Sequence, residues 1–239
     1  MRYNIAGSIT EYTPIYEMLR KKMEPYLYEG EGDTEITLHL TASFCEAKQK
    51  EQPHLTIPQC EYIFAGSQFY RKLLLQKGFM LHASAVEVEG KAYLFSADSG
   101  TGKSTHTKQW QAFLGTEKAL IINDDKPAIC KEAGHWFAYG TPFSGKTDEN
   151  LNRKAKLQGI CMLERGEKNQ IQQMDPAKAI VLLMKQTIVP RESESAAMLL
   201  AYLDDLLGEV PIYRMQCTIS KEAAKMAYNM MNGEKQDEN

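Results

Sequence analysis

The residues with the clearest chemical meaning are Ala97-Asp98-Ser99-Gly100-Thr101-Gly102-Lys103-Ser104, which fit the pattern of a phosphate-binding loop with alanine at its first position. Glycines at 100 and 102 let the backbone turn so that successive N–H groups point at phosphate oxygens. Lys103 is expected to bridge the β- and γ-phosphates, and the Ser104 hydroxyl to ligate Mg²⁺. The predicted nucleotide-binding residues are Ala97, Asp98, Ser99, Gly100, Thr101, Gly102, Lys103, Ser104 and Thr105. The alternative is a linker rich in serine and glycine that happens to contain Gly-Lys-Ser.

A pair of carboxylates, Asp124 and Asp125, ends the apolar stretch "LIINDD" shortly after the loop. In enzymes with such a loop, an acidic residue at the end of a neighbouring strand holds Mg²⁺. A second carboxylate beside it can accept a proton from an attacking hydroxyl. The alternative is an Asp-rich surface turn leading into Lys126-Pro127.

Two histidines lie near these motifs. His82, in "MLHASAV", precedes the loop, and a strand histidine taken alone is more often a hydrogen-bonded core residue than a catalyst. His106 follows within the helix that begins at the loop and could simply face solvent. The remaining histidines have no companions at metal-ligand spacing, which argues against zinc.

The elements that must position these residues follow from periodicity and turn residues. An alternating strand is expected over 34–42, and an amphipathic helix over 61–78. Two strands joined by a Glu-Gly turn at 89–90 fill 79–97 and lead into the loop, and a helix follows over 102–114. Further strands are expected over 118–125, 156–166 and 210–217, with two around Gly134 within 126–145. Helices are expected over 175–189, 191–208 and 220–232.

Composition places the chain among ordinary globular proteins. Charged residues make up 25% of the 239 residues and the formal net charge is −3, so neither nucleic acid nor an acidic membrane is an expected partner. The sequence has no apolar run of membrane-spanning length, and its start does not resemble a signal peptide. Five scattered cysteines without a Cys-x-x-Cys pair favour buried thiols and a reducing compartment. We therefore expect a cytoplasmic protein.

The order of elements predicts an α/β fold, of mixed α+β character, with a mixed β-sheet and helices toward the C-terminus. We expect one domain over 1–239. Residues 1–78 form an N-terminal strand and helix portion, 79–232 form the core with the phosphate loop, and 233–239 form a disordered tail.

The combination "LHASAV…GKAYLFSADSGTGKST…IINDDKPAI" resembles the HPr kinase/phosphorylase family and, more distantly, the ATP-dependent phosphoenolpyruvate carboxykinases. Both families carry a histidine, a short turn and strand, a phosphate loop, and an Asp-Asp pair closing a strand. The resemblance covers roughly residues 79–130. Residues 139–166 look like a segment of uncharacterised relatives that often accompany peptide-modification genes.

The resemblance implies roles for individual residues. Lys103 and Ser104 would bind nucleotide phosphate and Mg²⁺, with Asp124 supporting the metal and Asp125 acting as general base. His82 would lie against the phosphates. Lys146 and Arg153 are the candidates for stabilising the charge that develops during transfer, although both could equally be solvated side chains on a polar loop.

The sequence therefore predicts a Mg-ATP-dependent kinase that phosphorylates a hydroxyl, as in serine, of a small protein or peptide. The alternatives are a nucleotide-sensing module without transfer activity and a simple NTPase. The chain is much shorter than the carboxykinases, and it has no clear match to the later signature region of the HPr kinases. The acceptor therefore stays open. The hexameric HPr kinases make a homo-oligomer possible.

Overall fold

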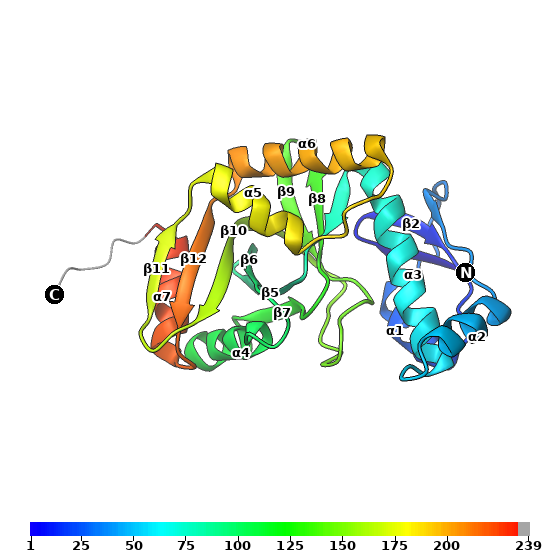
Figure 1. Ribbon diagram of the computed structural model, residues 1–239, viewed down its shortest axis with the longest axis horizontal. Helices are drawn as coiled ribbons and strands as arrows, with labels where there is room; N and C mark the ends of the chain where they lie inside the picture. Colours follow the sequence, from blue (N-terminus) through cyan, green and yellow to red (C-terminus); the bar gives the residue numbers. More distant parts are fainter. Residues whose placement is uncertain (234–239) are drawn as a thin grey trace.

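The computed structural model describes residues 1–233, so the predicted disordered tail lies almost entirely outside the described residues. Figure 1 shows an N-terminal part at one end of the molecule and a large sheet flanked by helices over the remainder. The N-terminal elements are β1 (Arg2–Ile5), β2 (Ser8–Glu11), α1 (Glu17–Met23), β3 (Ile36–Thr37), α2 (Ala42–Glu51) and α3 (Ile57–Leu73). Short 3-10 turns follow α1 (η1, Glu24–Tyr26) and α3 (η2, Leu74–Gln76).

Capping residues decide where the N-terminal helices begin. Thr56 caps α3 with a reciprocal capping box to Gln59, so the helix begins four residues before the predicted start at 61. The predicted strand over 34–42 is wrong beyond its first part, because only Ile36–Thr37 pairs with β2. The Thr41 side chain accepts a hydrogen bond from the Phe44 N–H and starts α2, a helix that was not predicted from the sequence.

The large sheet has nine strands within the described residues. They are β4 (Gly78–Met80), β5 (Ala83–Val88), β6 (Lys91–Ser96), β7 (Leu120–Asn123), β8 (Ala128–Glu132), β9 (His135–Tyr139), β10 (Lys154–Arg165), β11 (Gln170–Gln173) and β12 (Ile212–Cys217). Their order is β4-β8-β9-β10-β6-β5-β7, with β12 on β10 and β11 on β12. The pairs β6–β10 and β10–β12 are parallel and the other pairs of this sheet are antiparallel, so the predicted mixed sheet is confirmed.

Strand β10 is the organising strand of this sheet. One of its edges pairs with β6, while the other edge is divided between β9 near Lys154 and β12 from Ile160 onward. The antiparallel pair β5–β6, with its turn at Glu89–Gly90, matches the predicted hairpin. Strand β6, which leads into the predicted phosphate loop, therefore lies between two parts of the sheet. Strands β5 and β7 form one part, the β5–β7 wing, and strands β10 and β12 form the other, the β10–β12 wing.

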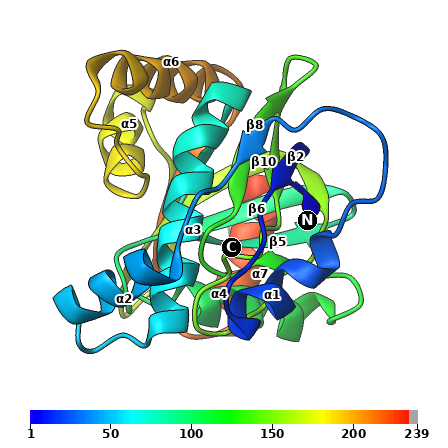
Figure 2. The ribbon, with the colours of Figure 1, turned by 90° about the vertical axis from the view of Figure 1, so that its right-hand side faces the viewer.

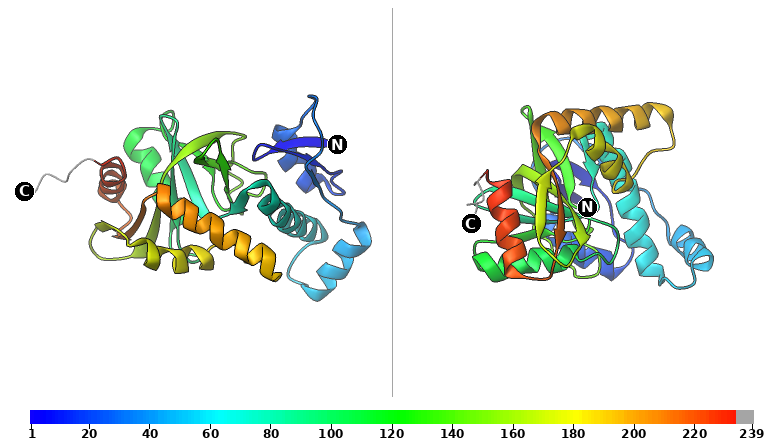
Figure 3. Two further views of the ribbon diagram at one scale, coloured as in Figure 1. Left: turned by 90° about the horizontal axis from the view of Figure 1, so that it is seen from above. Right: turned by 60° about the vertical axis from the view of Figure 1, so that its left-hand side comes forward.

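Helices cover both faces of the sheet, as Figures 1 and 3 show. Helices α5 (Pro176–Lys185) and α6 (Ser193–Glu209) pack on one face, where Leu94 and Trp136 are buried. Helices α4 (Lys103–Leu114) and α7 (Lys221–Met231) pack against each other on the opposite face. Alternation along β6 explains the two layers, because Leu94 joins the first core while its neighbours Tyr93 and Phe95 join the second.

The N-terminal part packs against one wing of the sheet, as the turned view in Figure 2 shows. A continuous apolar cluster joins Leu19 of α1 and Phe69 of α3 to Ala128 of β8 and to Phe143. The hydroxyl of Tyr70, on α3, also contacts Thr141 at 2.8 Å. This contact fixes α3 relative to the segment that follows the carboxylate pair.

Two further expectations concern the chain as a whole. All five cysteines are free thiols, and four of them are buried. No helix within residues 1–233 is both long enough and apolar enough to cross a membrane.

Candidate functional site

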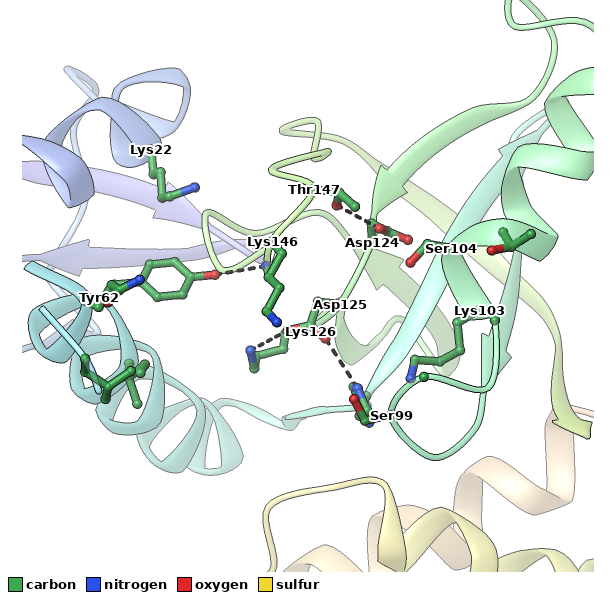
Figure 4. A pocket seen from close by; sticks show the side chains of 18 of the residues that line it. Lys22, Tyr62, Ser99, Lys103, Ser104, Asp124, Asp125, Lys126, Lys146 and Thr147 are labelled. Atoms are coloured by element: carbon green, nitrogen blue, oxygen red, sulfur yellow. Dashed lines mark hydrogen bonds and ion pairs between the residues drawn. The ribbon is translucent and has the colours of Figure 1, made fainter. Parts of the chain in front are cut away.

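The predicted phosphate loop connects the end of β6 to the start of α4. Gly100 and Gly102 have φ angles of 79° and 120°, a region of backbone conformation that favours glycine. Gly102 is also the N-cap residue of α4, so the positive end of the helix faces the loop. Figure 4 shows the loop curling around the Lys103 side chain. The local sequence therefore builds a turn of the kind that receives an anion.

Lys103 and Ser104 are the first two residues of α4. Lys103 is buried, and its Nζ donates to the Ala97 carbonyl at 3.0 Å, which holds the ammonium within the loop. Burial lowers the pKa of Lys103, although the charges of Asp125, Asp124 and Asp98 act in the opposite sense. The Ser104 side chain faces the same cavity (Figure 4).

Asp124 is held rigidly at the end of β7. One carboxylate oxygen accepts from the Ser84 hydroxyl at 2.6 Å, and the other accepts from the Thr147 hydroxyl at 2.7 Å. The residue is 4% exposed. Each oxygen keeps a free lone pair, so Asp124 and the Ser104 hydroxyl together offer the hard oxygen ligands that Mg²⁺ prefers. The described residues contain no cluster of three or more His, Cys, Asp or Glu suited to a metal. A nucleotide-bound Mg²⁺ needs only one or two protein ligands beside phosphate oxygens, so the residues fit this ion.

The turn after β7 is built by Asn123. Its amide oxygen accepts from the backbone N–H groups of Asp125 and Lys126, at 3.1 and 2.7 Å. Its amide nitrogen donates to the Thr141 carbonyl at 3.0 Å. Because the side chain is fully buried, this turn is fixed from inside the protein and aims both carboxylates at the cavity.

Asp125 contacts a histidine and a lysine. Its Oδ1 lies 3.3 Å from His82 Nε2, and its Oδ2 forms an ion pair with Lys126 (Figure 4). The antiparallel pairing of β5 with β7 creates the contact, since the Ala83 N–H donates to the Asp125 carbonyl. Burial alone would raise the pKa of Asp125. The hydrogen bond from His82 and the interactions with Lys126 outweigh it and lower that pKa to about 2.

Gln186, at the C-cap of α5, connects His82 to the phosphate loop. Its Nε2 donates to Asp98 Oδ1 at 3.0 Å, and its Oε1 lies 3.0 Å from His82 Nδ1. Because the ionised Asp98 can only accept, the amide orientation is fixed and His82 Nδ1 must carry a proton. Nε2, on the other side of the ring, faces Asp125 Oδ1.

A single cavity of about 730 Å³ collects most of the predicted site residues. Those lining it are His82, Ser99, Gly100, Gly102, Lys103, Ser104, Thr105, Asp124, Asp125 and Lys146. The wall facing the loop comes from the N-terminal part: Met18 and Lys22 of α1, Leu55 from the connection between α2 and α3, and Tyr62 of α3. The Tyr62 hydroxyl accepts from the Gly145 N–H at 3.0 Å, which joins α3 to the segment carrying Lys146.

Other predicted residues lie outside this cavity. Ala97, Asp98 and Thr101 belong to the loop but do not line the cavity. Arg153 does not reach it either. Arg153 forms an ion pair with Glu87 at 2.9 Å, and Glu87 pairs with Ala92 toward the opposite end of β6 from the loop. The structure therefore places Arg153 outside this cavity, contrary to its expected role in stabilising charge there.

The alternative that His106 faces solvent is wrong. The ring is 4% exposed, lies 4.4 Å from the Phe95 ring centroid, and accepts from Trp110 Nε1 at 3.2 Å. Burial lowers the pKa of His106 to about 4, so the ring is neutral at physiological pH.

Four of the residues that complete the cavity network were missed from the sequence: Ser84, Lys126, Thr147 and Gln186. The sequence did contain a local indication of Lys126, since this residue follows the carboxylate pair directly. Gln186 had none, because it lies 104 residues from His82 and reaches it only through the packing of α5 on the sheet.

Comparisons with known proteins place the chain among relatives. No curated protein matches it. Among solved structures, the chain is similar to the HPr(Ser) kinase/phosphatase from Coxiella burnetii, with a TM-score of 0.37 and 10% sequence identity, over 64% of this chain and 95% of the other. A family model described as SynChlorMet cassette protein ScmC matches residues 44–227, more than half of the chain. The chain therefore belongs to the ScmC family of SynChlorMet cassette proteins.

Proposed function

We propose that this protein is a Mg-ATP-dependent kinase that transfers the γ-phosphoryl group to a hydroxyl of a small protein or peptide. The observation that carries the proposal is the meeting of Asp125 and the phosphate loop across one cavity. A nucleotide-sensing module needs the loop but does not need a carboxylate paired with a histidine opposite it. That juxtaposition is what phosphoryl transfer to a hydroxyl requires.

The proposed step uses residues already held in position. The acceptor hydroxyl gives its proton to Asp125 while its oxygen bonds to the γ-phosphorus, and the bond to the β–γ bridging oxygen breaks to release ADP. Asp125 is ionised at neutral pH because its pKa is about 2. His82 Nε2 donates to Asp125 from 3.3 Å away and cannot take up this proton, so the proton leaves Asp125 to solvent after the transfer.

Charge on the transferring group has several nearby partners. Lys103 sits in the loop, and Lys146 lines the same cavity and makes no hydrogen bond or ion pair to any other described residue. Mg²⁺, held by Ser104 and Asp124, would neutralise phosphate charge. Positioning and electrostatic stabilisation then supply most of the catalysis.

The wall formed by the N-terminal helices supports a peptide or protein acceptor. Met18, Leu55 and Ile63 give it apolar surface and Lys22 adds an ammonium that pairs with Asp148, while Lys126 lies nearby on the turn after β7. A site that mixes apolar contact with a few placed charges suits an extended peptide segment better than a small polar metabolite. The acceptor hydroxyl would enter between this wall and the loop.

The test is to incubate the protein with γ-labelled ATP, Mg²⁺ and an extract of its source cells, and then to locate the label. Label on a protein or peptide supports the kinase and identifies its acceptor. Label only in free phosphate supports the NTPase alternative, and the absence of turnover despite ATP binding supports the sensor. Lys103→Ala serves as the control and should abolish transfer. Full ATP binding by Lys103→Ala would contradict the phosphate-loop assignment itself.

A further inference from the structure

A second cavity adjoins the phosphate loop on the side of β10 and β12. Its volume is about 580 Å³, within the range typical of small-molecule sites. Gly100, Gly102 and Thr105 line both cavities, so the loop is the partition between them. The first cavity lies toward the β5–β7 wing and the second toward the β10–β12 wing. A ligand held by the loop therefore has access to both.

The second cavity has a different chemistry from the first. It contains no carboxylate, and its walls include Leu163, Cys217 and Ile219. Ile219 is 77% exposed, more than any other large apolar side chain of the described residues. Gln109 also lines the cavity, and its amide makes no hydrogen bond within residues 1–233. Exposed aliphatic surface beside an unengaged amide is suited to a flat heterocycle that also carries hydrogen-bonding groups.

The walls of this cavity are fixed before any ligand binds. Asn169 Oδ1 accepts from the Thr218 N–H at 2.8 Å and from the Thr218 hydroxyl at 3.1 Å. These bonds hold the connection between β12 and α7 that carries Ile219. Arg165, at the end of β10, donates to the carbonyls of Gly100 and Thr101 and ties that wall to the loop. Ile219 is therefore exposed on a turn whose conformation these hydrogen bonds hold.

We propose that this second cavity binds the nucleoside of the triphosphate, with the base against Ile219 and Gln109. The inference rests on the proposed phosphate binding by the loop. The γ-phosphate must face Asp125 and the acceptor, which occupy the first cavity. A triphosphate lying along the loop then directs its nucleoside end away from Asp125, toward β10 and β12. The N-terminal wall stays free for the acceptor.

Binding measurements on ATP and tripolyphosphate, each with Mg²⁺, test the proposal because only ATP carries a nucleoside. Ile219→Ser is expected to weaken ATP binding about fivefold to tenfold, because serine removes the aliphatic surface on which the base would pack. The same variant should leave tripolyphosphate affinity within about twofold. Leu75→Ser, which replaces another exposed aliphatic residue at 64% exposure, is the matched control and should change neither affinity. Lys103→Ala should weaken both ligands.

Photolabelling with 8-azido-ATP supplies an independent readout. Label on the peptide containing residues 217–219, or on Gln109, supports the proposal, whereas label on Met18 or Leu55 places the base in the first cavity and overturns it. Equal loss of ATP and tripolyphosphate binding in Ile219→Ser also overturns it.

The binding of the wild-type protein separates this proposal from the proposed function. If wild-type protein binds tripolyphosphate as tightly as ATP, the nucleoside site is wrong while the phosphate-loop assignment stands. If ATP binds as proposed but no acceptor is ever labelled, the nucleoside site stands and the kinase proposal fails. If neither ligand binds, both are overturned.

Discussion

The two sides of the phosphate loop carry one histidine each, in opposite environments. On the β5–β7 side, His82 is half-buried and takes part in a polar chain that runs from Asp98 through Gln186 to Asp125. On the side of α4 and α7, His106 is almost fully buried among aromatic rings, and within residues 1–233 its side chain hydrogen-bonds to Trp110 alone. The first histidine contacts polar groups at both ring nitrogens, and the second is held neutral by burial.

The contrast shows how one loop is held from two directions. Apolar packing around His106, Phe95 and Trp110 anchors the start of α4, so Lys103 and Ser104 have a rigid support. The polar chain on the other side fixes Asp125 relative to the same loop without filling the cavity. Apolar packing therefore holds the loop in position, and the hydrogen-bonded side presents polar groups to the cavity. The following changes test this division, from the largest expected effect to the smallest.

Asp125→Asn should remove the proton acceptor while leaving the volume of the side chain almost unchanged. We expect phosphoryl transfer to fall about 10³-fold, with the Kd for ATP changed less than about threefold. Steady-state kinetics and calorimetric ATP titration measure the two quantities. Asp204→Asn, which removes an exposed carboxylate on α6, is the matched control. Unchanged transfer in Asp125→Asn would rule out its role as base.

His106→Gln tests the packed side through the pH dependence of stability. The folded protein holds the pKa of His106 at about 4 against an ordinary value of 6.5, so the unfolded chain binds more protons between these values. The free energy of unfolding should therefore decrease as pH falls from about 6.5 toward 4, by about 3 kcal/mol in all.

Glutamine keeps an acceptor for Trp110 but does not titrate. Urea unfolding at pH 7.5 and pH 4.5 should show that His106→Gln loses about 2 kcal/mol less stability on acidification than wild type. Asp125 contributes little over this interval, because its stabilising charge is lost only as pH falls from about 4 to about 2. His54→Gln, at an exposed position, should behave as wild type. If wild type and His106→Gln lost the same free energy of unfolding between pH 7.5 and pH 4.5, the low pKa assigned to His106 would be contradicted.

Gln186→Ala breaks the link between the loop and His82. The lost bonds involve a charged partner, Asp98, and the histidine that orients toward Asp125, so we expect kcat to fall about tenfold. The pH profile of kcat should change as well, because His82 Nδ1 loses its fixed partner. Gln172→Ala, on the exposed strand β11, should leave both unchanged. A wild-type kcat and pH profile in Gln186→Ala would show that the link has no role in catalysis.

Arg153→Gln should have the smallest effect, since the structure places this residue with Glu87 and outside the cavity. The rate of phosphoryl transfer should stay within about twofold of wild type. The free energy of unfolding should fall by only about 1 kcal/mol, because glutamine still donates a hydrogen bond to the buried Glu87. Kinetics and thermal unfolding check this. If Arg153→Gln lowered the rate of phosphoryl transfer more than Lys146→Ala does, Arg153 would have to be assigned to the site.

Local sequence determined the elements around the loop. Glycines at 100 and 102, the apolar stretch before them and the helical pattern after them predicted the β6–loop–α4 unit, because turn conformation and helix capping depend on neighbouring residues. The hairpin before the loop, the strand ending in Asp124 and Asp125, and the four C-terminal elements over 175–232 were predicted for the same reason. The short strands and helices of residues 1–51 were mostly missed, because their periodicity is weak over such lengths.

Only the tertiary structure decided which distant residues share a cavity. The pairing of β5 with β7 brings His82 to Asp125, the packing of α5 brings Gln186 to both His82 and Asp98, and the ion pair with Glu87 holds Arg153 outside the cavity. The sequence named residue types that bind phosphate and accept protons, since that chemistry belongs to the side chains themselves. Their distances depend on strand order and helix packing, which arise from burial across the whole chain and leave no local mark in the sequence.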